Sequence, residues 1–308
     1  MPVIRHDSPH QTLTARLRAA GCVFAEDEAR LLIDAAPTPA ALDEMARRRV
    51  AGLPLEHILG WAEFCGLRIV VDTGVFVPRR RTEFLVRQAA ALLATWRHEP
   101  AKASRRAPVV VDLCCGSGAV GAALAALAGP AELHCAIEPH AIEPHATEPR
   151  AVEPRPVELH SAIELHCADI DPAAVACART NVLPLGGKVH EGDLYDPLPA
   201  GLRGSVRLLA VNAPYVPSAD IETMPQEARV HEPRACLDGG TDGLEVQRRV
   251  AAGARQWLEP GGQVLIETSR RQAAQTSEIL RRHGFAPRVL RSEELGATVV
   301  AGALPPSG

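Results

Sequence analysis

The feature that most constrains the fold begins at Pro108, where short apolar runs start to alternate with segments of helical pattern. The runs are VVVDL, HCADI, RLLAV and QVLIET, and each has the length of one strand. Runs this apolar predict strands buried on both faces, in a mostly parallel sheet that helices cover on both sides. We therefore expect an α/β fold whose ligands bind beyond the carboxyl ends of the strands.

The chain divides into three regions. Residues 1–60 predict a small helical domain, in which Thr38 caps a helix that opens with Pro39. Residues 61–81 contain β-branched residues and predict a connecting β-hairpin with its turn at residues 72–74. Residues 82–308 open with a helical segment, EFLVRQAAALLATW, and continue as the α/β domain.

A five-residue near-repeat interrupts the α/β pattern at about residues 137–168. Its units carry Glu and Pro, as in AIEPH and AVEPR, and recurring proline excludes both a helix and a central strand. The sequence AELHCA at 131–136 recurs as IELHCA at 163–168, which indicates a tandem expansion within one strand. We expect residues 164–168 to form that strand and the remainder to form an exposed loop. The repeat itself explains its histidines, so we expect no metal site.

Composition excludes several classes of protein. The chain has no run of about 18 apolar residues, and its first residues lack the apolar core of a signal peptide. None of the eight cysteines forms a C-x-x-C pair, which argues against a zinc site and a disulfide framework. The net charge of -4 disfavours a nucleic-acid partner. We expect a monomeric cytoplasmic protein with free thiols and no membrane contact.

A glycine turn follows the first strand of the α/β region, and an acidic residue ends the second strand. Glycine in a strand-to-helix turn lets the backbone approach a ligand closely, although many such turns only make a tight bend. Asp169 stands where a carboxylate can accept both hydroxyls of a ribose, whereas Asp171 precedes Pro172 as a helix cap. Together these features predict a nucleoside-containing cofactor. The candidate binding residues are Asp112, Cys114, Cys115, Gly116, Ser117, Gly118 and Asp169.

A third motif, Asn212-Ala213-Pro214-Tyr215, follows the strand RLLAV. The side-chain oxygen of Asn212 and a nearby carbonyl could accept both hydrogens of a planar NH2 group, beside the flat face of Tyr215. The alternative is a simple turn with a half-buried tyrosine. As a functional site, the motif would hold an amide or amino nitrogen.

In order and spacing, these motifs resemble those of the HemK/PrmC-like protein-(glutamine-N5) methyltransferases. The resemblance covers roughly residues 25–302, apart from the repeat. The segments VPRRRTE and EPRACLDGGTDGL, at 77–83 and 232–244, are much more specific than a glycine turn. The chain is most similar to a branch of that family that carries Asn-Ala-Pro-Tyr.

The resemblance implies a seven-stranded, Rossmann-like class I methyltransferase domain behind a helical domain that recognises the substrate. It implies that S-adenosylmethionine lies over the glycine turn, with Asp169 on the ribose and with Asp193 and Leu194 beside the adenine. It also implies that Asn212 and the carbonyl of Ala213 hold the NH2 group of a glutamine, in a release factor or another translation protein. The chain departs from the family at Cys114, where glycine is usual, and at Ala213, where proline is usual.

Two other functions stay open from the residues alone. An amino-methyltransferase acting on adenine would use a similar site, and its main support is the run Arg79-Arg80-Arg81. Such a run is more often a solvated face, and only 3% of the residues are aromatic, which leaves little stacking surface for a base. A catalytically impaired protein that binds the cofactor is the other alternative. The departures at Cys114 and Ala213 and the inserted repeat make it plausible, whereas the presence of Asn212 and Asp169 argues against it.

Overall fold

The computed structural model describes residues 8–97, 107–128 and 162–306. Leu17 and Leu32 are fully buried among the helices of the first part. The hydroxyl of Thr38 accepts a hydrogen bond from the backbone N–H of Ala41, which confirms the expected helix start there. The helices of this part are α1 (Pro9–Ala19), α2 (Ala25–Ala35), α3 (Pro39–Val50) and α4 (Leu55–Leu59).

A β-hairpin follows, formed by β1 (Trp61–Phe64) and β2 (Leu67–Val70). Its turn consists of Cys65 and Gly66, whose φ angles of 52° and 76° fit a two-residue turn. The expected turn at residues 72–74 is therefore not the hairpin turn. That second turn, closed by the N–H of Val75 and the carbonyl of Asp72, comes after the hairpin. The register follows from burial, because it places Phe64 and Ile69 in the core.

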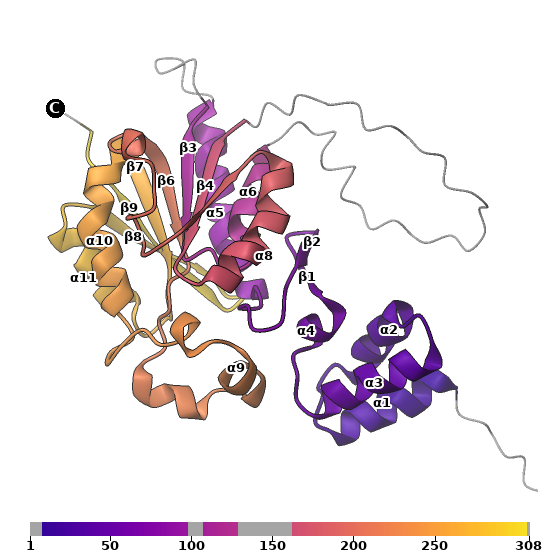
Figure 1. The fold of residues 1–308 in the computed structure, drawn as a ribbon. Helices are drawn as coiled ribbons and strands as arrows, with labels where there is room; N and C mark the ends of the chain where they lie inside the picture. Colours follow the sequence, from indigo (N-terminus) through magenta and orange to yellow (C-terminus); the bar gives the residue numbers. More distant parts are fainter. Residues whose placement is uncertain (1–7, 98–106, 129–161, 307–308) are drawn as a thin grey trace, which may run out of the picture.

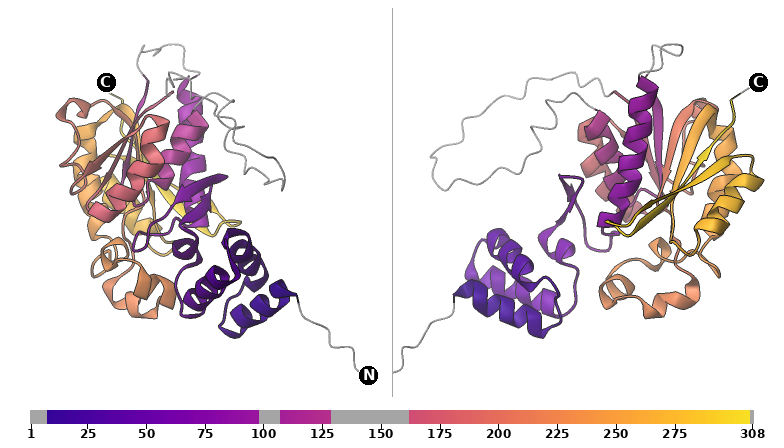
Figure 2. Two further views of the ribbon diagram at one scale, coloured as in Figure 1. Left: turned by 45° about the vertical axis from the view of Figure 1, so that its right-hand side comes forward. Right: turned by 180° about the vertical axis from the view of Figure 1, so that it is seen from behind.

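The rest of the described chain forms a seven-stranded sheet with helices on both faces (Figures 1 and 2). The strand order is β5-β4-β3-β6-β7-β9-β8, and β9 runs antiparallel to the other six strands. The predicted α/β fold with a mostly parallel sheet is confirmed. The elements are η1 (Arg80–Thr82), α5 (Glu83–Arg97), β3 (Val109–Leu113), α6 (Ala119–Ala128), β4 (Glu164–Asp169), α8 (Pro172–Val182), η3 (Leu183–Leu185), β5 (Lys188–Glu191), η4 (Ala200–Leu202), β6 (Val206–Val211), η5 (Ser218–Thr223), α9 (Gln226–His231), η6 (Arg234–Cys236), α10 (Glu245–Trp257), β7 (Leu258–Glu267), α11 (Ala273–Arg282), β8 (Ala286–Ser292) and β9 (Ala297–Ala303).

The core has one apolar layer on each face of the sheet. Helices α5, α6 and α8 cover one face, and α10 and α11 cover the other (Figure 1). Leu208 and Leu209 are consecutive on β6 and fully buried, one in each layer. This double burial explains why the strand is a continuous apolar run.

Strand β4 includes the second copy of the repeated sequence. It pairs in parallel with β3, and Cys167 lies opposite Asp112. The expectation that residues 164–168 form the strand is confirmed. Nearly all of the rest of the insert, up to residue 161, lies outside the described residues, as does the first copy of the repeated sequence.

The strand order reverses between β3 and β6, so a crevice opens at the carboxyl ends of these strands. Helices α1–α4 and α9 lie beyond this edge of the sheet (Figure 1). Arg49 of α3 links the two groups, because its guanidinium bonds Glu28 of α2 at 2.6 Å and Glu227 of α9 at 2.5 Å. The N-terminal helices are thereby fixed to a segment that borders the crevice.

The residues that the structure describes contain no membrane-spanning helix, no cluster of metal ligands and no disulfide bond. None of their helices combines the length and the apolar character that a membrane crossing requires. Nowhere among these residues do three or more His, Cys, Asp or Glu side chains gather as metal ligands. The seven cysteines found there are all free thiols.

Gly253 of α10 provides a test of the packing. The ring of Tyr195 stacks on Trp257 at a centroid distance of 5.8 Å, and a Cβ atom at position 253 would lie 2.4 Å from that ring. Replacing an exposed helical glycine with alanine usually stabilises a protein by about 1 kcal/mol. Here we expect Gly253→Ala to lower the free energy of unfolding by about 1–3 kcal/mol, because the ring of Tyr195 must move.

Urea denaturation measures this effect, with Gly201→Ala as the matched control. A Cβ atom at position 201 meets nothing within 4 Å, so that variant should stay within about 0.5 kcal/mol of the wild type. A Gly253→Ala variant as stable as the wild type would contradict the packing described here.

Candidate active site

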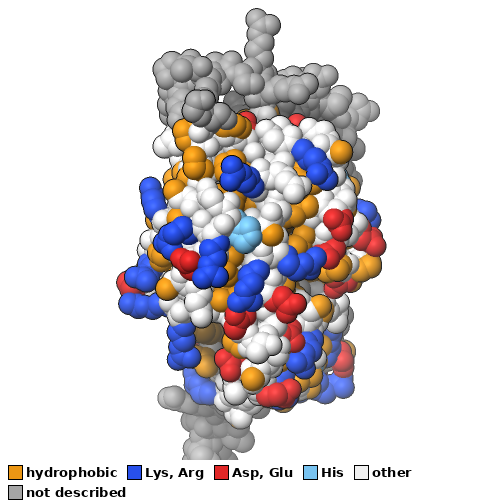
Figure 3. All heavy atoms as spheres, turned by 90° about the vertical axis from the view of Figure 1, so that its left-hand side faces the viewer, with side chains coloured by type: hydrophobic (Ala, Val, Ile, Leu, Met, Phe, Trp, Pro, Cys, Tyr) orange, Lys and Arg blue, Asp and Glu red, His pale blue; other side chains and the backbone are white. Residues whose placement is uncertain are grey.

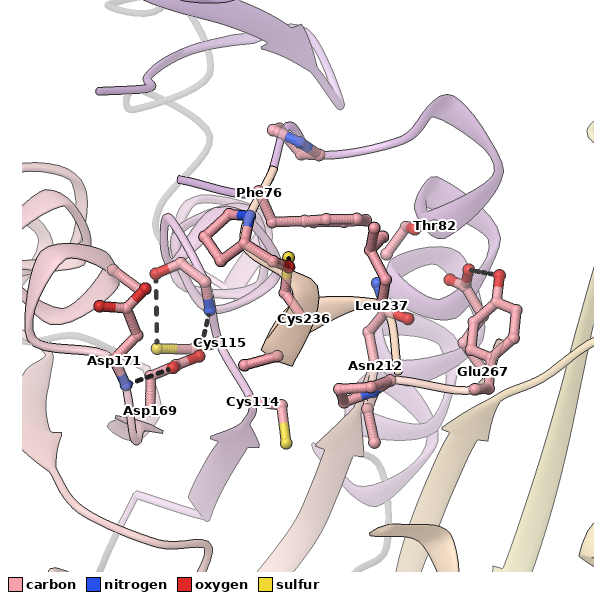
Figure 4. Close-up of a pocket in the computed structure, with 18 of the residues that line it drawn as sticks. Phe76, Thr82, Cys114, Cys115, Asp169, Asp171, Asn212, Cys236, Leu237 and Glu267 are labelled. Atoms are coloured by element: carbon pink, nitrogen blue, oxygen red, sulfur yellow. Dashed lines mark hydrogen bonds between the residues drawn. The ribbon is translucent and has the colours of Figure 1, made fainter. Parts of the chain in front are cut away.

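A cavity of about 620 Å³ lies at the carboxyl ends of β3, β4, β6 and β7 (Figure 4). Its other walls come from the segment that links the hairpin to α5 and from residues 216–238. The sheet edge therefore brings together residues that are more than a hundred positions apart in the sequence. The residues predicted from the sequence that line it are Asp112, Cys114, Cys115, Gly116, Ser117, Asp169, Asp193, Leu194, Asn212, Ala213, Pro214 and Tyr215.

Gly118 is the one predicted site residue that does not line the cavity. Its φ is 76°, and a Cβ atom there would lie 2.7 Å from the side chain of Val182 and 3.1 Å from that of Ala178. The glycine allows the turn to pack closely against α8. The structure thus supports a packing role for Gly118 in place of contact with a ligand.

The glycine turn has its backbone open to the cavity at Gly116. The nearest atom to a Cβ built there is 3.9 Å away, so a ligand can approach the main chain. Asp112 lies beneath the turn, where its carboxylate accepts the N–H of Gly121 at 2.9 Å. Burial raises the pKa of Asp112 to about 7. Asp112 therefore orders the start of α6 as well as bordering the cavity.

Asp169 ends β4 and fixes the shape of the glycine turn. One carboxylate oxygen accepts the N–H of Gly116 at 2.8 Å, and the other accepts the N–H of Asp171 at 3.0 Å. Each oxygen can accept a second hydrogen bond, so the carboxylate can also bind a pair of hydroxyls. Burial raises its pKa. Asp171 accepts the N–H of Ala173 and caps α8, which confirms its predicted structural role, although it also lies at the cavity wall (Figure 4).

Asp193 and Leu194 border the cavity in the loop after β5. The carboxylate of Asp193 bonds the guanidinium of Arg249 on α10 at 2.6 Å. Leu194 has a left-handed backbone with a φ of 48°, so the chain turns sharply beside the cavity. The loop offers an apolar side chain and an acceptor next to each other.

The Asn212–Tyr215 motif leaves β6 into the cavity and is held from behind. The carbonyl of Tyr215 accepts a hydrogen bond from the side chain of Gln272 at 2.9 Å. Gly243 packs so closely that a Cβ atom there would lie 2.3 Å from the same carbonyl oxygen. Position 243, in the sequence Asp242-Gly243-Leu244, therefore requires glycine for a steric reason, because any side chain there would collide with the backbone of Tyr215.

The acidic residue at the end of β7, Glu267, was not among the predicted site residues. The side chain of Glu267 is 3% exposed, lines the cavity, and has one oxygen 3.4 Å from both the hydroxyl of Tyr215 and the guanidinium of Arg81. Burial raises its pKa. Its position was visible in the sequence, because the run QVLIET carries this acid as its last residue but one, at the same sheet edge as Asp169 and Asn212.

The arginine run differs from the expected solvated face. Arg79 bonds both oxygens of Glu232, which is buried, at 2.7 and 2.6 Å, and Arg81 faces Glu267. Arg79 and Arg81 both line the cavity, although Arg81 is also partly exposed to solvent, whereas Arg80 is exposed and does not line it. Their partners are distant in sequence, so the run alone could not indicate them.

Cys114 stands in a strained backbone conformation. Its φ is 57°, in the left-handed region that costs a residue with a Cβ atom about 1–2 kcal/mol. Burial raises the pKa of its thiol, which disfavours the reactive thiolate. The strain gives a physical reason why glycine suits this position.

Comparison of glycine and alanine variants tests that strain. We expect Cys114→Gly to be more stable than Cys114→Ala by about 1 kcal/mol, because both lose the thiol and only glycine relieves the backbone. Cys236, in the right-handed turn η6, is the matched control. There the alanine variant should be the more stable by about 0.5–1 kcal/mol in urea denaturation. The same order of stability at both positions would contradict the strain at Cys114.

Comparison with known proteins gives close relatives, although no protein-family model matches the chain. A release factor glutamine methyltransferase of Geobacter sulfurreducens is 33% identical over 270 residues, covering 85% of this chain and 77% of the relative. A 4-amino-L-phenylalanine/4-methylamino-L-phenylalanine methyltransferase of Streptomyces pristinaespiralis is 31% identical, covering 88% and 80%. A solved protein-(glutamine-N5) methyltransferase of Alicyclobacillus acidocaldarius aligns with a TM-score of 0.37 and 18% identity, over 75% of this chain and 95% of that one.

Proposed function

The chain belongs to the family of release factor glutamine methyltransferases, and we propose that it transfers a methyl group from S-adenosylmethionine to the side-chain amide nitrogen of a glutamine in a protein. The observation that carries this proposal is the position of Asn212 and Ala213. They line the same cavity as Asp169 and the glycine turn, so an acceptor pair for an NH2 group lies beside a site suited to a nucleoside.

The residues around the glycine turn fit S-adenosylmethionine. The cavity volume falls within the roughly 300–1,000 Å³ that is usual for small-molecule sites. Asp169 retains acceptor capacity for the ribose hydroxyls, the open backbone at Gly116 admits the ligand, and Asp193 with Leu194 would border the adenine. When bound, the cofactor supplies an electrophilic methyl group on a sulfonium.

The acceptors of the motif would orient the target amide. An amide nitrogen is a poor nucleophile, because its lone pair is delocalised into the carbonyl. The side-chain oxygen of Asn212 and the carbonyl of Ala213 would each accept one N–H, which directs the nitrogen toward the methyl group. The methyl group would pass from sulfur, which would keep the electron pair of the broken S–C bond, to the amide nitrogen. The same acceptors would stabilise the positive charge on nitrogen until one N–H proton passed to water. Alanine in place of the family's proline retains the carbonyl that this role requires.

We propose a release factor as the substrate and the cytoplasm, where release factors act on ribosomes, as the location. We further propose that residues 1–60 recognise the substrate and that residues 82–308 form the catalytic domain. Residues 61–81 would connect these two domains, and the enzyme would be a monomer. The link from Arg49 to Glu227 supports the first of these, because α9 borders the cavity.

Other NH2 groups present the same pair of N–H donors. One relative is named for 4-amino-L-phenylalanine, an aromatic amine, and adenine is a second flat amine. On the face in Figure 3, basic side chains are separated by acidic, apolar and uncharged ones, which offers no continuous track for a nucleic acid there. We therefore favour the glutamine amide.

The ribose contact can be tested by calorimetry. We expect Asp169→Ala to weaken binding of S-adenosylmethionine by about tenfold or more, since a hydrogen bond to a charged group contributes about 1.5–3 kcal/mol. Asp43→Ala is the control, because this exposed acid pairs with Arg16 in the N-terminal helices and does not line the cavity, so the variant should bind as the wild type does. Equal affinity in wild type and Asp169→Ala would remove Asp169 from the binding site.

The amide contact can be tested by single-turnover kinetics at saturating S-adenosylmethionine. We expect Asn212→Ala to slow methyl transfer to a glutamine substrate by about tenfold or more, with the melting temperature changed by a few degrees at most. Asn181→Ala is the contrasting control. The side chain of Asn181 bonds the carbonyls of Val70 and Ser117, so its loss should lower the melting temperature instead. An unchanged rate in Asn212→Ala would refute the role given to Asn212.

A further inference from the structure

Glu267 is a buried acid that the methyl-transfer scheme above does not use. Its side chain is 3% exposed, and its oxygen Oε2 is buried without a hydrogen bond of standard geometry to any described residue. Thr82 of η1 is a further polar neighbour, which acts to lower the pKa of Glu267. A carboxylate in that state lowers stability, because the protein does not replace all the water it has lost. Such groups gather at functional sites, and Glu267 lies in the wall of the cavity (Figure 4).

The two side chains that face Oε1 of Glu267 come from separate segments of the chain. Oε1 lies 3.4 Å from the hydroxyl of Tyr215, which follows β6, and 3.4 Å from Nε of Arg81, on η1. The guanidinium of Arg81 also lies 5.8 Å from the centre of the Tyr215 ring. The carboxylate of Glu267 thus connects the segment after the hairpin with the tyrosine of the Asn212–Tyr215 motif.

From this geometry we infer that Glu267 is a positioning residue, which holds the ring of Tyr215 against the target amide through the tyrosine hydroxyl. This inference rests on the proposed function. The present O–O distance of 3.4 Å is longer than the usual 2.7–2.8 Å of an O–H···O bond, so the ring is only loosely held from this side. A substrate packed on the opposite face of the ring would press the hydroxyl toward Oε1, and the ring would then be fixed on both sides.

A purely structural role makes the opposite prediction about stability. If Glu267 mainly stabilised the fold, Glu267→Gln would lower the melting temperature. We expect the melting temperature to stay equal or to rise, because glutamine has nearly the same shape and leaves no buried charge.

The first test needs no activity. The chain contains two tyrosines, Tyr195 and Tyr215, so labelling of tyrosine Cζ with ¹³C gives two signals, which a Tyr215→Phe variant assigns. Burial raises the pKa of Glu267, and the charged group that faces it is Arg81, with Arg79 farther along the same segment. We expect the Tyr215 signal to shift as a carboxyl titrates above its usual pKa, and to lose this shift in Glu267→Gln. Persistence of the shift in that variant would overturn the inference.

The second test measures kcat and KM with a glutamine-containing protein substrate. We expect Glu267→Gln and Tyr215→Phe each to lower kcat by about tenfold with little change in KM, and the double variant to be no slower than either. Glu259→Gln is the matched control, because Glu259 lies at the other end of β7 and pairs with Arg207. Additive losses, or a Glu267→Gln kcat equal to that of the wild type, would refute the inference.

The two tests separate this inference from the proposed function. A wild-type protein that methylates no glutamine refutes the proposed function, and with it the role toward the amide, even if the NMR coupling between Glu267 and Tyr215 is present. A wild-type protein that methylates glutamine while its NMR coupling is absent refutes only the positioning role.

Discussion

The ion pair between Arg79 and Glu232 sets the geometry on which the cavity depends. Glu232 is buried, and its carboxylate accepts both the guanidinium of Arg79 and the backbone N–H of Val77. These bonds join the segment after the hairpin to the segment after α9, which form the two cavity walls that the sheet does not supply. Arg79 is partly exposed, but its removal would leave the buried carboxylate of Glu232 without its charged partner, so this contact is hard to replace.

A second set of contacts fixes the walls to the sheet edge. Residues 237–239 pair with Val216 through backbone hydrogen bonds, and Gln272 bonds the carbonyl of Tyr215. On the other side, Asp169 holds the glycine turn through the N–H of Gly116. The glycine turn and the Asn212–Tyr215 motif are therefore positioned by separate contacts.

The parts of the fold predictable from sequence are those determined by local chemistry. The apolar run of β6, the cap at Thr38 and the cap at Asp171 each depend on neighbouring residues, and all three occur as expected. The hairpin turn was misplaced because the aspartate and glycine of residues 72–74 are a stronger turn signal than Cys65 and Gly66. Strands β5, β8 and β9 were absent from the predicted runs, and β5 and β8 lie at the sheet edges with several exposed side chains, so they lack a continuous apolar pattern.

The site was predictable to the extent that sheet topology gathers its residues. Asp169 and Asn212 end strands, and the ends of parallel strands meet at one edge. The roles of Arg79 and Arg81 could not be foreseen, because an arginine on the surface and one facing a buried carboxylate look alike in sequence. Cys114 shows the converse, since a departure from glycine in the sequence becomes a definite backbone strain in the structure.

The central claim is that the acceptors at Asn212 and Ala213 select a glutamine amide. In the most direct measurement, the full chain is incubated with S-adenosylmethionine that carries a deuterated methyl group. The candidate substrates, present together, are a purified release factor, 4-aminophenylalanine and an adenine-containing oligonucleotide, and tandem mass spectrometry locates the label. The account predicts label on the side-chain amide nitrogen of one glutamine in the release factor, and none when Asn212→Ala replaces the wild type. Label on the aromatic amine or on adenine, with the release factor unlabelled, would contradict it.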